Sequence, residues 1–176
     1  MDRRKFLGKA GATLAASAAV TLTKAPNVIA QPKFQWRLVT SWPPSFEILN
    51  GTAQRFARQV DEMSGGRLKI QMYTAGELIP PLGVFDAVSN GSIDAYSSGP
   101  YFWAGKEPAM QWFCAVPFGL NAQGMYSWFY QGGGLKLMEE AYQPFNLVPR
   151  PGGGTGAQMG GWFRKKINTI ADYKGL

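Results

Sequence analysis

The chain has few side chains that could carry out a chemical reaction. Histidine is absent from its 176 residues, so it can form neither a Ser-His-Asp nor a Cys-His triad, nor a histidine-based metal site. The one cysteine, Cys114, lies in an aromatic run, which indicates a buried structural thiol rather than a nucleophile. The acids Glu47, Glu77 and Asp94 have no carboxylate or histidine close by in the sequence. We therefore expect no enzyme activity from this chain.

A glycine-rich run raises the alternative of nucleotide binding. Residues 152–157 fit the pattern G-x-G-x-x-A, and Asp172 follows twenty residues after Gly152. In dinucleotide-binding folds a helix begins at these glycines and holds a pyrophosphate, whereas here two more glycines and a strand-like alternation follow. We interpret the run as extended backbone that passes close to other backbone or to a ligand. The side-chain carbonyl of Gln158 could ligate a hard cation, although a solvent-exposed or hydrogen-bonded glutamine is the more common outcome.

Positive charge is concentrated at the N-terminus. The formal net charge is +7, but residues 1–30 hold five of the 18 basic and one of the 11 acidic residues, which leaves 13 basic and 10 acidic. This near-neutral remainder does not favour nucleic-acid binding. Arg3 and Arg4, an apolar pair and a weakly apolar segment resemble a twin-arginine signal peptide over residues 1–30, with cleavage after Ala30. We expect a periplasmic protein exported by the twin-arginine route. The alternative, a buried N-terminal helix, lacks a one-sided apolar stripe.

The remaining chain alternates strand and helix patterns. Period-two alternation predicts strands, and apolar residues at helical spacing predict helices, the first of them with Ser45 as its N-cap. The order strand–helix–strand–helix–strand favours an α/β fold with a mostly parallel sheet and flanking helices. The strands are expected over residues 34–40, 68–73 and 92–98, and the helices over 46–63, 84–89, 125–130 and 135–142.

Ligands of such sheets bind beyond the carboxyl ends of the strands. Two loops of this chain are expected there, at residues 41–47 and 99–105. The second loop carries Tyr101 and Trp103, whose rings either line a pocket or pack in the core. The sequence leaves both readings open.

Three further stretches stand out, VFDAVSNGSID at 84–94, GGWFRKKI at 160–167 and IADYKGL at 170–176. They resemble the extracytoplasmic solute-binding subunits of tripartite ATP-independent periplasmic (TRAP) transporters. The first is similar to that family's helix-to-strand junction, and the others to its interdomain strand and the approach to a signature strand. The loop at 99–105 and the segments 116–119 and 158–163 are closest to the branch that binds 2-oxo acids such as pyruvate. The resemblance covers residues 34–176.

The resemblance implies a periplasmic-binding-protein-like lobe in residues 31–148. It also implies an interdomain strand and the start of a truncated second lobe in residues 149–176. Such a protein closes on a small organic anion, without chemistry, and delivers it to membrane permease subunits. It uses no cofactor, and a sodium ion can be bound with the substrate. The resemblance leaves a homodimer open for the full-length form. An exported enzyme or a sensor lobe for a small carboxylated compound is the alternative.

The resemblance also assigns residues. Gln158 matches a glutamine that binds sodium in the 2-oxo-acid branch. Tyr101 and Trp103, from their place in the loop at 99–105, and Trp162, near the expected cleft, are with Gln158 the expected substrate-binding residues. The family's substrate arginine follows Lys-Gly-Leu, and with the remaining sodium ligands it lies beyond Leu176. Arg164 is a poor substitute because we expect it to face solvent. We therefore expect residues 1–176 to be a fragment that binds its ligand weakly or not at all.

Overall fold

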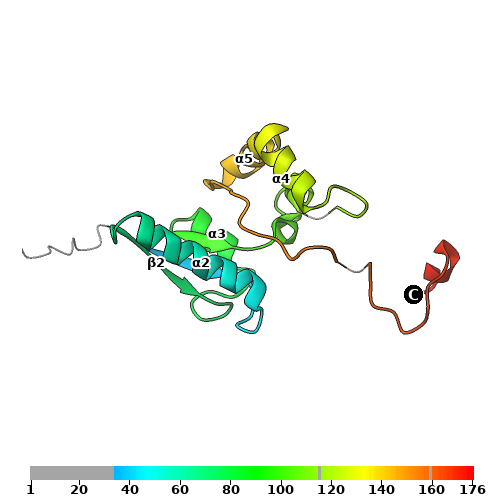
Figure 1. Ribbon diagram of the computed structural model, residues 1–176. Coiled ribbons are helices and arrows are strands. Elements are labelled where there is room, and N and C mark those ends of the chain that lie inside the picture. Colours follow the sequence, from blue (N-terminus) through cyan, green and yellow to red (C-terminus); the bar gives the residue numbers. More distant parts are fainter. Residues whose placement is uncertain (1–33, 115, 159) are drawn as a thin grey trace, which may run out of the picture.

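A parallel three-stranded sheet forms the centre of the N-terminal part of the molecule. The computed structural model describes residues 34–114, 116–158 and 160–176, so the predicted signal peptide lies outside the described residues (Figure 1). The strand order is β2-β1-β3, with Phe34 of β1 opposite Leu68 of β2 and Leu38 opposite Ala95 of β3. The first two strands occupy the predicted residues, and the third is shorter than predicted. Their bounds are β1 Phe34–Thr40, β2 Leu68–Tyr73 and β3 Ala95–Ser97.

Helix α2 (Glu47–Met63) lies alongside β2 and connects β1 to it (Figure 1). The prediction of Ser45 as N-cap is wrong, because the cap position is Phe46 and no side chain caps the helix. Two other contacts fix the turn that enters the helix. Phe46 N donates to the carbonyl of Pro43 at 2.9 Å, and the Asn50 amide donates to the same carbonyl at 2.8 Å. Thr40 donates its hydroxyl to Asn50 Oδ1 at 2.9 Å, which ties the end of β1 to the helix.

The main core lies between the sheet and the helices that follow it. Phe85 of α3 (Val84–Ser89) is at its centre, with its ring 5.0 Å from Trp103 and 6.2 Å from Tyr142. Val39 of β1 packs in the same cluster, so this face of the sheet is covered. The covering elements are the 3-10 helices η1 (Pro100–Trp103), η2 (Pro108–Phe113) and η3 (Gln143–Phe145) and the helices α4 (Ala122–Gln131) and α5 (Gly134–Tyr142).

The triple glycine separates α4 from α5 as predicted. Gly133 has a φ of +83°, a left-handed conformation that side chains disfavour. No helix in the described part of the chain is long and apolar enough to cross a membrane.

The C-terminal residues differ from the prediction. Residues 149–158 and 160–176 form no strand, and their one regular element is the 3-10 helix η4 (Ile170–Tyr173). A strand exists only beside a partner strand, and none lies next to this segment in the described residues. The described residues of this segment therefore form no strand here, and Figure 1 shows the segment extending away from the sheet and helices. Its assignment as an interdomain strand stays a prediction. It approaches α2 at one point, where a Cβ on Gly153 would lie 3.1 Å from Thr52 Cγ2.

Candidate functional site

The loops at the carboxyl ends of the three strands are bound to one another. Ser41, directly after β1, donates its backbone N–H to the carbonyl of Ser97 at 3.1 Å. Its hydroxyl donates to the carbonyl of Pro81, in the loop after β2, at 2.7 Å. The same hydroxyl is hydrogen-bonded to that of Ser98, after β3, at 2.8 Å. One serine therefore joins the segments that follow all three strands, whereas the sequence placed the ligand site on the loops after β1 and β3 only.

An aromatic cluster lies beside this serine. The Trp42 ring is 5.9 Å from Phe46 and 6.0 Å from Phe102, and Phe102 is 4.5 Å from Tyr101. Trp42 is only 8% exposed. Its carbonyl accepts a hydrogen bond from Ala75 N at 3.1 Å, which connects the loops after β1 and β2. The cluster thus gives this edge of the sheet an apolar, ordered surface.

Buried polar atoms without a hydrogen-bond partner also gather in these loops. In the described part of the chain they are Trp42 Nε1, Thr74 Oγ1 and Trp103 Nε1, and each of these residues lies in a segment that follows a strand. Such a group typically costs about 1–3 kcal/mol, so native proteins rarely leave one unpaired. Trp42 and Thr74 belong to the loops after β1 and β2, whereas Trp103 belongs to the core.

The two predicted aromatic residues of η1 have different surroundings. Trp103 is only 3% exposed and packs in the core, with its ring 6.2 Å from Tyr96 as well as against Phe85. Tyr101 is 46% exposed at the edge. Partial burial raises the pKa of the Tyr101 phenol above its ordinary value, and the nearby Cys114 raises it further. Tyr101 is therefore a neutral hydrogen-bond donor at physiological pH.

The two predicted residues of the C-terminal segment lie apart from the edge. Gln158 is exposed and donates its amide to Thr155 Oγ1 at 2.8 Å. That bond uses the nitrogen and not the carbonyl oxygen that a cation would need. Trp162 is 88% exposed, and among the described residues no hydrogen bond, ion pair or ring contact joins either residue to η1. Arg164 is exposed, in agreement with the prediction that it faces solvent.

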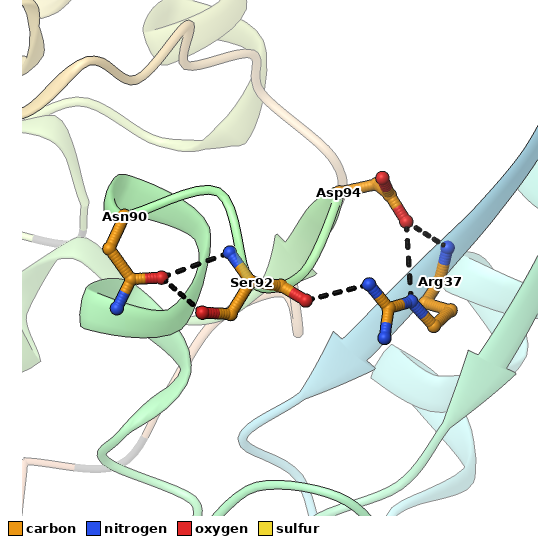
Figure 2. A network of polar contacts seen from close by, with 4 residues as sticks. All are labelled: Arg37, Asn90, Ser92 and Asp94. Atoms are coloured by element: carbon orange, nitrogen blue, oxygen red, sulfur yellow. Dashed lines mark hydrogen bonds and ion pairs between the residues drawn. The ribbon is translucent and has the colours of Figure 1, made fainter.

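Two of the three isolated acids, Asp94 and Glu77, have structural partners. Asp94 Oδ2 accepts from Arg37 N at 2.7 Å and lies 3.6 Å from Arg37 Nε. Arg37 Nη2 donates to the carbonyl of Ser92 at 2.6 Å, and Asn90 Oδ1 accepts from both the N–H and the hydroxyl of Ser92 (Figure 2). Glu77 accepts from Thr74 N at 2.5 Å. Asp94 and Glu77 thus hold turns in place.

No cluster of potential metal ligands is found in the described residues. No three His, Cys, Asp or Glu side chains there come together to hold a metal ion. Two surface hollows, of about 410 and 530 Å³, lie around α5. None of the residues that line these hollows belongs to the loops at residues 41–47 and 99–105.

Three groups of residues at or near the sheet were missed from the sequence. They are Trp42, the Ser41–Ser98 pair and the Arg37–Asp94 pair. The sequence indicated the loop that contains Trp42, but nothing in it showed that an indole nitrogen would be buried there. The two pairs each join residues 57 positions apart, so no local pattern could reveal them.

Known proteins with similar sequences and folds have been characterised. Residues 38–176 match the family described as bacterial extracellular solute-binding protein, family 7. A monocarboxylate 2-oxoacid-binding periplasmic protein of Nostoc is 45% identical over 179 residues, which is 100% of this chain and 49% of the relative. The chain therefore spans about half the length of this relative.

Two solved structures also match this chain, with similar sequence identity and coverage. Both are TRAP periplasmic solute-binding proteins, and each match covers 82% of this chain and 44% of the other. The protein from Pseudoalteromonas atlantica, with bound sodium and pyruvate, is 46% identical with a TM-score of 0.77. The protein from Colwellia psychrerythraea, with bound calcium and pyruvate, is 42% identical with a TM-score of 0.78. The predicted α/β fold, a parallel sheet with flanking helices, is confirmed.

Proposed function

Because the chain belongs to the bacterial extracellular solute-binding protein family 7, we propose that it forms one lobe of a transport receptor. The receptor captures a small carboxylate, a 2-oxo acid such as pyruvate, and delivers it to the membrane permease subunits of a TRAP transporter. It works in the periplasm, and Arg3 and Arg4 direct it there by the twin-arginine route. Relatives of this kind bind pyruvate together with sodium or calcium, which supports the choice of ligand.

The observation that carries the proposal is the carboxyl edge of the sheet. The exposed phenol of Tyr101 lies there, beside the aromatic cluster of Trp42 and Phe102. A carboxylate or keto oxygen is an acceptor that suits this neutral donor. Since neither surface hollow lies on the loops of this edge, we infer that the ligand is enclosed when a second wall closes over the edge. Gln158 and Trp162, on the extended C-terminal segment, approach the ligand on closure.

The cation is assigned to Gln158. Its side-chain carbonyl is a hard oxygen ligand. The hydrogen bond to Thr155 is made by the amide nitrogen and does not involve that oxygen. We propose that sodium binds there and bridges to the ligand. The remaining ligands to the ion come from outside the half of the relatives' length that this chain matches. We infer a receptor because the family and the similar proteins are solute-binding proteins.

The test is tryptophan fluorescence during a pyruvate titration, in sodium, calcium and potassium buffers. It uses the 176-residue chain alone and the chain fused to the part of the Pseudoalteromonas protein that it does not match. We expect a saturable, cation-dependent change in the fusion and little in the chain alone. Gln158→Ala should weaken binding about tenfold in sodium, the loss of roughly 1.4 kcal/mol, whereas the exposed control Gln54→Ala should not. A fusion that does not respond to pyruvate in any buffer would refute the proposed ligand.

A further inference from the structure

Gly99, at the carboxyl end of β3, leaves no room for a side chain although its backbone conformation would allow one. Its backbone has φ −86° and ψ 128°, an extended conformation that any residue adopts. The obstacle to a side chain is steric. A Cβ on Gly99 would lie 2.6 Å from Tyr101 Cε1, 2.7 Å from Cζ and 3.0 Å from the hydroxyl oxygen. All three nearest atoms belong to Tyr101, so it is this ring that excludes a side chain.

The Tyr101 ring is also held from a second direction. It contacts Phe102 at 4.5 Å, and Phe102 rests on Trp42 at 6.0 Å. Trp42 is in turn fixed by the hydrogen bond from Ala75 N to its carbonyl. The position of the phenol therefore depends on Gly99 and on an aromatic contact that reaches the loop after β1.

We propose that Gly99 is a positioning residue that lets the Tyr101 ring fold back over the end of β3, where its hydroxyl is held to donate a hydrogen bond to the ligand carboxylate. The ligand part of this inference rests on the proposed function. This role agrees with the chemistry of the side chain, because a neutral phenol donates a hydrogen bond to a carboxylate, whereas a phenolate would repel it. The phenol is neutral at physiological pH already at the ordinary tyrosine pKa of about 10, and burial raises the pKa of Tyr101 further.

The first test follows the ring without any ligand. Tyrosine ring carbons are labelled with 13C in the 176-residue chain, Tyr101 is assigned with Tyr101→Phe, and its titration is measured by NMR. In Gly99→Ala the ring must leave its place, so the pKa of Tyr101 should fall toward the ordinary value of about 10. Gly105→Ala is the matched control, because a Cβ there meets nothing within 4 Å. An unchanged Tyr101 titration in Gly99→Ala would overturn the proposal.

Stability provides a check that Gly99→Ala acts through the ring. If this substitution lowers the melting temperature, adding Tyr101→Ala should restore it, because the clash is with that ring. A double variant that stays as destabilised as Gly99→Ala would show another cause and would overturn the inference.

The second test measures pyruvate binding in the fused protein. Gly99→Ala should weaken binding about fivefold to tenfold, as expected for one lost hydrogen bond. In a Tyr101→Ala background it should have no further effect, and an additional loss there would overturn the role through Tyr101. A fusion that binds no pyruvate while Gly99→Ala still releases the ring would refute the proposed ligand and would support the positioning role of Gly99.

Discussion

Replacing Asp94 with alanine removes the carboxylate that joins β1 to the turn between α3 and β3. In the structure this carboxylate accepts the Arg37 N–H at 2.7 Å and faces the Arg37 guanidinium at 3.6 Å (Figure 2). The hydrogen bond from Arg37 Nη2 to the Ser92 carbonyl remains when Asp94 is changed. The substitution therefore isolates the contribution of one carboxylate to the attachment of this turn.

The expected loss of unfolding free energy in Asp94→Ala follows from the exposure and the geometry of this contact. The side chains of Arg37 and Asp94 are 49% and 35% exposed, so the ion pair itself contributes little, about 0–1 kcal/mol. The hydrogen bond from a backbone N–H to a charged acceptor contributes about 1.5–3 kcal/mol in general, and partial exposure favours the lower end. We expect Asp94→Ala to lower the free energy of unfolding by about 1.5 kcal/mol. Asp94→Asn should cost about half as much, because an amide oxygen still accepts the N–H without the charge.

The assay is urea unfolding at pH 7, followed by tryptophan fluorescence. Glu62→Ala is the matched control, because Glu62 pairs with Arg58 at 3.9 Å while their side chains are 69% and 70% exposed. This control should change the free energy of unfolding by less than about 0.5 kcal/mol. If Asp94→Ala costs no more than Glu62→Ala, the Arg37–Asp94 contact does not stabilise the lobe and the reasoning is refuted.

Three further predictions concern the backbone, the core and pH. Gly133→Ala should lower the free energy of unfolding by about 1–2 kcal/mol in urea, since φ at this residue is +83°, and an unchanged midpoint would contradict this. Phe85→Ala should cost about 3–5 kcal/mol because the ring is buried among aromatic residues, whereas half-exposed Phe56→Ala should cost less than about 1 kcal/mol. Burial raises the pKa of Tyr142 to about 12 and that of Tyr96 further, so both phenols are neutral in the folded state. The stability that they contribute is complete below the unfolded pKa of about 10 and is lost as pH rises through the folded values. Urea midpoints should therefore fall above pH 10, and Tyr142→Phe should reduce that fall; equal slopes in both proteins would contradict the assignment.

Local patterns predicted most of the secondary structure correctly. Strand β1, strand β2 and helix α3 have the predicted bounds, because the period of the apolar residues indicates the type and extent of each element. The burial of β1 does not follow this period, since its first four residues are exposed and its last three are buried. The break at Gly133 followed from glycine chemistry in the same way. Strand β3 is shorter than predicted because its pairing with β1 extends only from Leu38 to Thr40. The motifs of residues 84–94 and 158–176 led to a family that the comparison confirms.

The different burial of Tyr101 and Trp103 in η1 could not be predicted from the sequence. Tyr101 and Trp103 are two positions apart and would share a face in a strand. In a 3-10 helix, with three residues per turn, they point in different directions. Trp103 is consequently packed in the core, and Tyr101 is exposed at the edge. The assignment of either residue to substrate binding stays a prediction.

The sequence by itself determined the local elements, the family and the absence from this chain of a histidine-dependent triad, since each depends on residue types or on neighbours along the chain. Only the tertiary structure decided the attachment of the loops through Ser41 and Ser98, the structural use of Asp94 and the folding of Tyr101 over Gly99. The first two depend on residues 57 positions apart, and the third on a side-chain direction set by η1 and by Trp42. The predicted strand of the C-terminal segment needs a partner strand, and a segment's own residues do not determine whether one lies beside it.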